Sequence, residues 1–424
     1  KERTQKYRHC FADPRTANGF NRLWKDMCYQ ILVERAKGSR LLDIDGNEYI
    51  DIVNGFGPGF LGHSPDFVSE ALHAQLDKTI AVGPQSELAG ETSELVCQLV
   101  GAERVCFLNT GSEAVQAAMR LARTVTGRDK IVVFSKDYHG NFDEVLVKGA
   151  NRNGKFKTLP IAPGIPRRAV EDVIVLEYGS DESLQIIRDQ ADQLAAVMVE
   201  PMQSRRPEFQ PKEFIRELRQ ITEEKGCLFV FDEVITGFRT GPGGAQEFYG
   251  VKADLATYGK VIGGGMPVGL VAGKREYMDT FDGGMWQYGD DSFPEAPVTF
   301  FAGTFVRHPL AVAAVHVMAK FFLKQPRAFW DTIYQRAGRL AGTIDQFFVD
   351  QGIGIRMPQF SSQMFVRVSE EEKYGGLLFC QLREKGVFIL EGLPCYLTAS
   401  HTDEDVDYVI DAVKESVADL QSGG

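Results

Sequence analysis

The sequence predicts an α/β fold with a mostly parallel sheet covered by helices, joined to a smaller α+β domain. Short apolar runs alternate with longer amphipathic stretches from about residue 100 to residue 275. Buried parallel strands are continuously apolar and their crossovers are usually helical, so this alternation indicates a parallel sheet. The 424 residues, 44% of them hydrophobic, suffice for two or three domains. We expect a large domain at residues 61–305 and a small domain built from residues 1–60 and 306–424.

The predicted elements follow in order along the chain. "DIDGNEY" is typical of a hairpin turn between apolar strands. Strands are then predicted at "RVCFLN", "KIVVFS", "AAVMVE", "CLFVFDE", "DLATYG" and "GLVAG", with helices such as "SEAVQAAMRLARTVTG" and "PKEFIRELRQITEEKG" between them. A long helix is predicted near residues 309–324. The runs "QMFVRV", "GVFIL" and "LTAS", with one helix among them and a last helix from about Asp403, indicate the α+β domain.

Composition limits the classes of function. A net charge of −11 argues against a nucleic-acid binder, which needs a basic face. No apolar run approaches the roughly 20 residues of a membrane span. Seven scattered cysteines without CxxC spacing predict a reduced, cytoplasmic protein with no zinc site. The polar start at Lys1 and the "ADLQSGG" end are similar to linkers, so we expect a piece of a longer chain, although a processed terminus would look the same.

The first predicted strand of the large domain runs into a glycine turn and a helix, in "LNTGSEAVQAAMRLAR". Thr110, Gly111 and Ser112 would there present N–H groups and a hydroxyl at a helix N-terminus, which suits a phosphate dianion. The alternative is an ordinary N-cap formed by Thr110 or Ser112.

Candidate functional residues also follow other predicted strands. Tyr138 and His139 follow the second strand, where a planar ligand could stack, or where an aromatic residue could pack on the sheet edge. "LFVFDE" runs directly into Asp232 and Glu233, and a carboxylate at the end of a buried strand needs a partner such as a protonated ring nitrogen, a helix cap or a salt bridge. Lys260 lies among small residues in "ATYGKVIGGGMPVG", either as a packed stem with a solvated head or as an amine tuned for reaction with a carbonyl.

Together these residues favour pyridoxal 5′-phosphate, which needs a lysine, an acid at its ring nitrogen, a stacking aromatic ring and a phosphate cup. The segments "LNTGSEAVQAAMRLAR", "YHG", "VEPMQSR", "FDEVITGFRTG", "ATYGKVIGGGMPVG" and "FAGTFVRHPLA" also resemble the class III aminotransferases of pyridoxal-phosphate fold type I, over about residues 35 to 415.

The resemblance implies a role for each matching residue. Lys260 would bind the cofactor covalently and, once released, move a proton as a base. Asp232 would pair with the ring nitrogen, Val234 and Tyr138 would pack on the two ring faces, and Thr304 would reach the phosphate of a neighbouring subunit, so a homodimer is implied. The remaining residues predicted to contact the cofactor are Thr110, Gly111, Ser112, His139, Glu200 and Gln203, and Phe56 is predicted to contact the substrate.

Within the family, the chain broadly resembles glutamate-1-semialdehyde aminomutase in "GNEYIDIVNGFGPGFLGHSPDFVSEAL" and "GMPVGLVAG". It departs at "EGLPCYLTASH", which lacks the glutamate of the aminomutases and has no arginine for a donor carboxylate. Ile235 stands where a glutamine often bonds the cofactor phenol oxygen, so Gln203 is the candidate for that contact. Arg205 replaces a usual glutamate or asparagine and is a candidate clamp for the donor carboxylate, unless it pairs with an acid such as Glu208.

Three hypotheses of function follow. "QSRRP", "TGPGGAQEFYGVKADLATYGK" and "WQYGDDSFPEAPVTFFAGTFVRHPLA" resemble aminotransferase domains of hybrid polyketide/nonribosomal peptide synthases. That resemblance implies transfer of an amino group from an amino acid, glutamate or glutamine, to a β-ketoacyl thioester on an acyl carrier protein. The second hypothesis is a free-standing aminotransferase or an aminomutase-like enzyme acting on a small molecule. The third is a catalytically silent docking domain, against which the presence of Lys260, Asp232 and Tyr138 argues.

Overall fold

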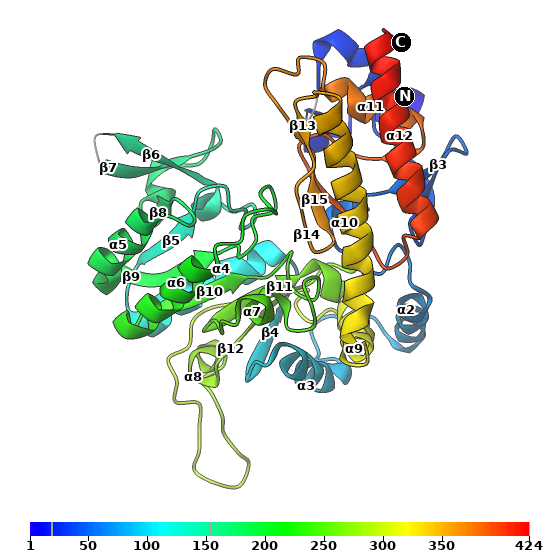
Figure 1. The fold of residues 1–424 in the computed structure, drawn as a ribbon. Coiled ribbons are helices and arrows are strands. Elements are labelled where there is room, and N and C mark those ends of the chain that lie inside the picture. Colours follow the sequence, from blue (N-terminus) through cyan, green and yellow to red (C-terminus); the bar gives the residue numbers. More distant parts are fainter. Residues whose placement is uncertain (18–19, 153–154, 424) are drawn as a thin grey trace. The chain divides into compact units, whose positions relative to one another are not determined.

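A computed structural model describes residues 1–17, 20–152 and 155–423, and the chain forms two compact units (Figure 1). Unit 1 comprises Lys1–Pro65 and Asp331–Gly424, and unit 2 comprises Asp66–Trp330. Residues 306–330, which the sequence analysis assigned to the small domain, therefore lie in unit 2. Neither terminus adds to unit 2, so both chain ends build unit 1.

Unit 2 is organised around a seven-stranded sheet with the order β4-β12-β11-β10-β9-β5-β8. All its strands point the same way except β12, which is antiparallel to both of its neighbours. The mostly parallel sheet of the prediction is confirmed, together with all six predicted strands. The bounds are β4 Arg104–Leu108, β5 Lys130–Phe134, β8 Val173–Leu176, β9 Leu194–Val199, β10 Leu228–Asp232, β11 Leu255–Gly259 and β12 Gly269–Gly273.

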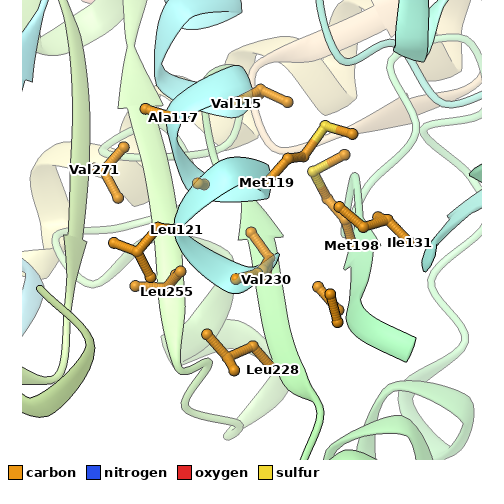
Figure 2. Close-up of a cluster of buried hydrophobic side chains, with 14 of the residues drawn as sticks. Val115, Ala117, Met119, Leu121, Ile131, Met198, Leu228, Val230, Leu255 and Val271 are labelled. Atoms are coloured by element: carbon orange, nitrogen blue, oxygen red, sulfur yellow. The ribbon is translucent and has the colours of Figure 1, made fainter. Parts of the chain in front are cut away.

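Helix α4 (Gly111–Thr126) covers one face of this sheet through a buried cluster of aliphatic side chains (Figure 2). Val115 and Met119, four residues apart on the helix, lie with Leu228 and Val230 of β10 in that cluster. Successive strand residues point to opposite faces, so Phe231 points away from α4. Its ring meets Tyr249 edge-on at 6.5 Å.

The opposite face carries other helices, bound by aromatic contacts. Phe214 of α6 (Lys212–Lys225) packs edge-on against Phe134 of β5 at 5.5 Å. The α4 and α6 helices are confirmed within one residue at each end. The remaining elements of unit 2 include α2 Asp66–Lys78, α3 Leu88–Val100, β6 Val147–Arg152, β7 Lys155–Pro160, α5 Asp181–Gln190, α7 Gly244–Tyr249, α8 Arg275–Met278 and α9 Pro309–Leu323.

Unit 1 contains a four-stranded sheet, β1-β2-β3-β17, and the predicted hairpin is its β2–β3 pair. Its turn is held by the Asp43 carboxylate, which accepts the N–H groups of Asp45 at 2.9 Å and Asn47 at 2.8 Å. The sheet strands are β1 Val33–Lys37, β2 Arg40–Asp43, β3 Glu48–Asp51 and β17 Val387–Phe388; shorter strands are β13 Ile355–Arg356, β14 Gln359–Phe360, β15 Gln363–Phe365, β16 Arg367–Val368 and β18 Pro394–Tyr396.

The helices of unit 1 are α1 Glu2–Tyr7, most of α10 Arg327–Asp350, α11 Gly376–Glu384 and α12 Asp403–Ser422. A capping box at Thr402 and Asp405 begins α12, which confirms the predicted last helix. One expectation was wrong, because the strand near "LTAS" ends before it, at Tyr396. The polar chain start contains α1 and two 3₁₀ turns. Across the part of the chain that is described, no helix combines the length and hydropathy needed to cross a membrane.

Candidate active site

Lys260 and the start of α4 lie at the same edge of the unit 2 sheet. Lys260 directly follows β11, with a left-handed backbone φ of 43°. Strand β12 begins at Gly269, which pairs with Gly259 on one side and Leu108 on the other. A Cβ at Gly269 would lie 2.0 Å from the carbonyl oxygen of Thr110, so only glycine allows this approach. Two segments 150 residues apart in sequence therefore meet where the prediction placed them.

The Lys260 side chain is partly buried, and no hydrogen bond or ion pair reaches it from residues 1–17, 20–152 or 155–423. Burial lowers the pKa of Lys260 to about 8, although Glu200 and Asp232 nearby act in the opposite direction. A substantial fraction of the amine is therefore neutral near physiological pH. A neutral amine is the nucleophilic form that reacts with a carbonyl group.

Asp232 is 4% exposed at the end of β10 and both carboxylate oxygens are engaged. Oδ2 accepts from His139 Nδ1 at 2.7 Å. Oδ1 accepts from the Thr257 hydroxyl at 2.9 Å and from the Val234 N–H at 3.2 Å. The parallel register pairs Asp232 with Thr257 across β10 and β11, which explains why this hydroxyl is within reach.

His139 joins Asp232 to a second buried carboxylate. Its Nε2 lies 3.2 Å from Asp137 Oδ2, and the side chain is 2% exposed. Burial opposes protonation, but the bonds to Asp137 and Asp232 outweigh it and raise the pKa of His139 to about 10. The ring is therefore an imidazolium at neutral pH, and it forms a charge-assisted hydrogen bond with Asp232.

Glu200 and Gln203 fix the loops around this cluster. The carboxylate of Glu200 accepts the N–H of Tyr138 at 3.2 Å and of Ser204 at 3.0 Å, and burial raises its pKa to about 8. Gln203 donates both amide hydrogens, to Ser135 O at 2.8 Å and Asp137 Oδ1 at 2.6 Å. Gln203 therefore has no further hydrogen for a cofactor oxygen, while its buried Oε1 has no partner among the described residues.

Glu233 serves a different purpose from its neighbour Asp232. Its carboxylate accepts the N–H groups of Ala245 at 2.7 Å and Gln246 at 3.1 Å, at the start of α7, and the Thr236 hydroxyl at 2.9 Å. Burial raises the pKa of Glu233 to about 7. Of the two adjacent acids, one is a structural helix cap and the other belongs to the cluster.

The N-terminus of α4 combines the two alternatives of the sequence analysis. Thr110 is an N-cap, since its hydroxyl accepts the Glu113 N–H at 3.2 Å. The Ser112 hydroxyl accepts the Asn141 N–H at 3.2 Å. The first N–H groups of a helix have no intrahelical acceptor, so those of Gly111 and Ser112 can still bind an anion.

The residues present fit the predicted cofactor. A Cβ at Gly111 would lie 2.8 Å from Val234 Cγ1, so only glycine allows the helix N-terminus to approach Val234 this closely. Tyr138 is 55% exposed, as expected of a ring that stacks on a ligand. Thr304 and Arg205 are exposed in unit 2, whereas Phe56 lies in unit 1, where the Arg15 guanidinium stacks on its ring at 4.7 Å.

Sequence reasoning missed Asp137, Thr257 and the almost fully buried Arg239. Asp137 directly precedes the Tyr138–His139 pair at a strand end, so the position itself was a usable signal. Thr257 could be found only from strand register. Arg239 acts on Lys260 through its charge, which lowers the pKa of the lysine.

Comparison with known proteins agrees with this geometry. Residues 22–340 match the family model "Aminotransferase class-III". The chain is 35% identical over 409 residues to a glutamate-1-semialdehyde 2,1-aminomutase of Alkaliphilus oremlandii, covering 92% of this chain and 91% of the relative. An aminomutase of the same name from Methanocaldococcus jannaschii is 35% identical over 416 residues, covering 93% and 92%.

Solved structures give the same result. An omega-transaminase from Sphaerobacter thermophilus superposes with a TM-score of 0.87 at 27% identity, covering 99% of this chain and 97% of that one. A glutamate-1-semialdehyde aminomutase from Pseudomonas aeruginosa PAO1, 20% identical with a TM-score of 0.79 and covering 96% and 95%, shares the fold. This chain therefore belongs to the class III aminotransferases, and it is a pyridoxal-phosphate-dependent transaminase of fold type I.

Proposed function

We propose that this transaminase acts on a small molecule, either between an amino acid donor and a carbonyl acceptor or within one substrate as an aminomutase does. The proposal rests on Lys260, an amine whose pKa is lowered to about 8 beside Asp232 and Glu200. Its support from relatives is the 35% identity to two glutamate-1-semialdehyde aminomutases over nearly the whole chain.

Each residue of the cluster has a chemical task in this proposal. Bound pyridoxal phosphate supplies an electron sink that weakens the C–H bond next to the amino group. Asp232, held in place by His139 and Thr257, keeps the ring nitrogen protonated. Lys260 would hold the cofactor and, as a neutral amine, would act as the base that moves a proton between two carbons. The N–H groups of Gly111 and Ser112 would hold the phosphate, and Tyr138 would cover the ring.

A second candidate is transfer to a β-ketoacyl thioester on an acyl carrier protein. Two features of the residues that could bind the donor carboxylate favour it. No arginine lies between Gly392 and His401, and the exposed Arg205 lies in the loop after β9. An exposed guanidinium can bind a donor carboxylate and then move aside for an acceptor that has none. The comparisons named above include no carrier-dependent enzyme, so this candidate ranks second.

The same proposal includes a homodimer. The long segment between α8 and α9 extends from the rest of unit 2 as a loop (Figure 1). Several of its apolar side chains are exposed, among them Trp286 and Phe293. Tyr288 is 93% exposed and Phe300 78%, and Thr304 lies at the end of this segment. Contiguous exposed apolar surface of this kind marks association sites.

One experiment separates the candidates. The enzyme carrying an amino group from glutamate or glutamine is mixed either with small carbonyl compounds, including glutamate-1-semialdehyde, or with a β-ketoacyl-loaded carrier protein. Intact-protein mass spectrometry follows the carrier and chromatography follows the small products. Turnover of small compounds alone supports the first candidate, and turnover of the loaded carrier alone moves the second ahead. A cofactor-loaded protein that turns over no amino acid donor, no small carbonyl compound including glutamate-1-semialdehyde, and no loaded carrier would contradict both.

A further inference from the structure

Unit 1 contains a cavity of about 670 Å³, open to solvent on one side, that none of the residues assigned to the cofactor lines, although Phe56, predicted to contact the substrate, does. Its wall comes from the first 31 residues, the turn that contains Phe56, and α11 with the segment after β17. Much of that wall is apolar: Phe20, Trp24, Phe56, Phe379, Phe388 and Leu390. Cavities of this size and composition are typical of sites for small organic ligands.

Three guanidinium groups also line this cavity: those of Arg8, Arg15 and Arg383. None of them forms an ion pair with a carboxylate of the described residues. Arg15 stacks on the Phe56 ring at 4.7 Å, and Arg383 donates to the sulfur of Cys380 at 3.4 Å, a weak acceptor. The cavity thus holds positive charge without a matching anion, in a chain whose net charge is −11.

Among the described residues that line this cavity, one is acidic, Glu391. Burial raises its pKa, whereas the charge of Arg383 acts to lower it. One partly buried carboxyl cannot balance three guanidiniums. The buried hydroxyl of Thr4 also lines the cavity and has no hydrogen-bond partner in the described part of the chain.

We propose that this cavity binds an amphiphilic anion, an apolar acyl chain that ends in or carries a carboxylate or phosphate. The aromatic and aliphatic wall removes the chain from water. Guanidinium groups bind the planar or tetrahedral oxyanion through paired N–H donors, and the Thr4 hydroxyl supplies another donor. A cationic ligand would meet repulsion, and a neutral one would leave the guanidiniums unmatched.

Two sources share this chemistry: a free fatty carboxylate and a phosphopantetheine thioester arm. The inference does not need the transamination reaction, since it concerns binding alone. Its test can therefore fail while the proposed function holds, and the reverse is also true.

The test uses the cofactor-loaded protein and no amine donor. Calorimetry measures binding of decanoate, of the neutral decanol, and of S-decanoyl-4′-phosphopantetheine. We expect decanoate to bind at least tenfold more tightly than decanol, and more weakly as salt is added. Tighter binding of the phosphopantetheine thioester identifies the carrier arm as the source, and tighter binding of decanoate identifies the free carboxylate.

Variants locate the site. Arg383→Ala and Arg8→Ala should each weaken binding of the tighter anion by about ten- to a hundredfold, the scale of a hydrogen bond to a charged group. Arg35→Ala, an exposed arginine of β1 away from the cavity, should leave it unchanged.

Three results would overturn the inference. These are equal affinity for decanoate and decanol, unchanged affinity in both Arg383→Ala and Arg8→Ala, and no binding of either anion at millimolar concentration. Arg8 is exposed, so its variant keeps the test valid if Arg383→Ala does not fold.

Discussion

The amine of Lys260 should titrate far below an ordinary lysine. Its pKa is lowered from 10.5 to about 8 by burial, so at pH 7 the neutral fraction rises from roughly 0.0003 to roughly 0.1, about 300-fold. Lys274 is the matched control, because its bond to Asp254 at 2.9 Å raises its pKa. The two lysines lie in the same unit and differ in the sign of the shift.

Reductive methylation with formaldehyde in the cofactor-free protein measures this difference, since an uncharged reagent senses only the neutral amine. Labelling of each lysine is followed by peptide mass spectrometry between pH 6 and 11. The Lys260 rate should rise tenfold per pH unit and level off near pH 8, while the Lys274 rate keeps rising beyond pH 10. Glu200→Gln should move the Lys260 midpoint lower still, because the ionised carboxylate raises it. A Lys260 midpoint at or above 10 would refute the reasoning.

Four further predictions follow from the same contacts. Asp232→Asn should slow proton transfer in single-turnover measurements about 10²- to 10³-fold, as expected for a lost preorganised charge, and a change under threefold would make the carboxylate structural only. His139→Asn should lower the free energy of unfolding by about 3–5 kcal/mol. Because the pKa of His139 is about 10 in the folded protein and 6.5 in the unfolded chain, this loss should be complete below pH 6.5 and should shrink as the pH rises toward 10. A difference in unfolding free energy between variant and wild type that stays constant from pH 6.5 to pH 10 would contradict this prediction. Sedimentation should find a dimer, with Thr304→Ala weakening cofactor retention; a fully active monomer at nanomolar concentration speaks against both. Arg205→Ala should slow the donor half-reaction about tenfold in stopped-flow spectra and spare the acceptor half, whereas equal losses in both would remove Arg205 as the donor clamp.

Much of unit 2 could be predicted because the sequence patterns that indicate its strands and helices are local. Five apolar residues before Asp232 identify a buried strand, and parallel strands bring their carboxyl ends to one edge, so Asp232, Tyr138 and Lys260 could be grouped before any coordinates were known. Strand direction is not encoded in an apolar run, and the reversal of β12 was therefore not predicted. Strand β8 was missed because four residues between polar segments give little periodicity.

The contacts inside the site were harder to predict. Glu200 meets Tyr138 only after loops from different strands converge, and no spacing in the sequence reports that. Gln203 was chosen for its chemistry as a donor, yet its amide hydrogens are committed to Ser135 and Asp137. Phe56 was chosen by resemblance, and its membership of unit 1 leaves the predicted substrate contact a prediction.

The pairing of Gly259 with Gly269 has a consequence for how this enzyme can vary. The residues from Lys260 to Val268 form a short tether whose two ends are hydrogen-bonded neighbours in the sheet. Length added within the tether, for example at Gly265, where a Cβ would meet nothing within 4 Å, changes neither anchor. The amine of Lys260 would keep its position at the start of this segment while the residues around Gly265 lengthen or change in sequence. This segment can thus change in length without moving the lysine on which the chemistry depends.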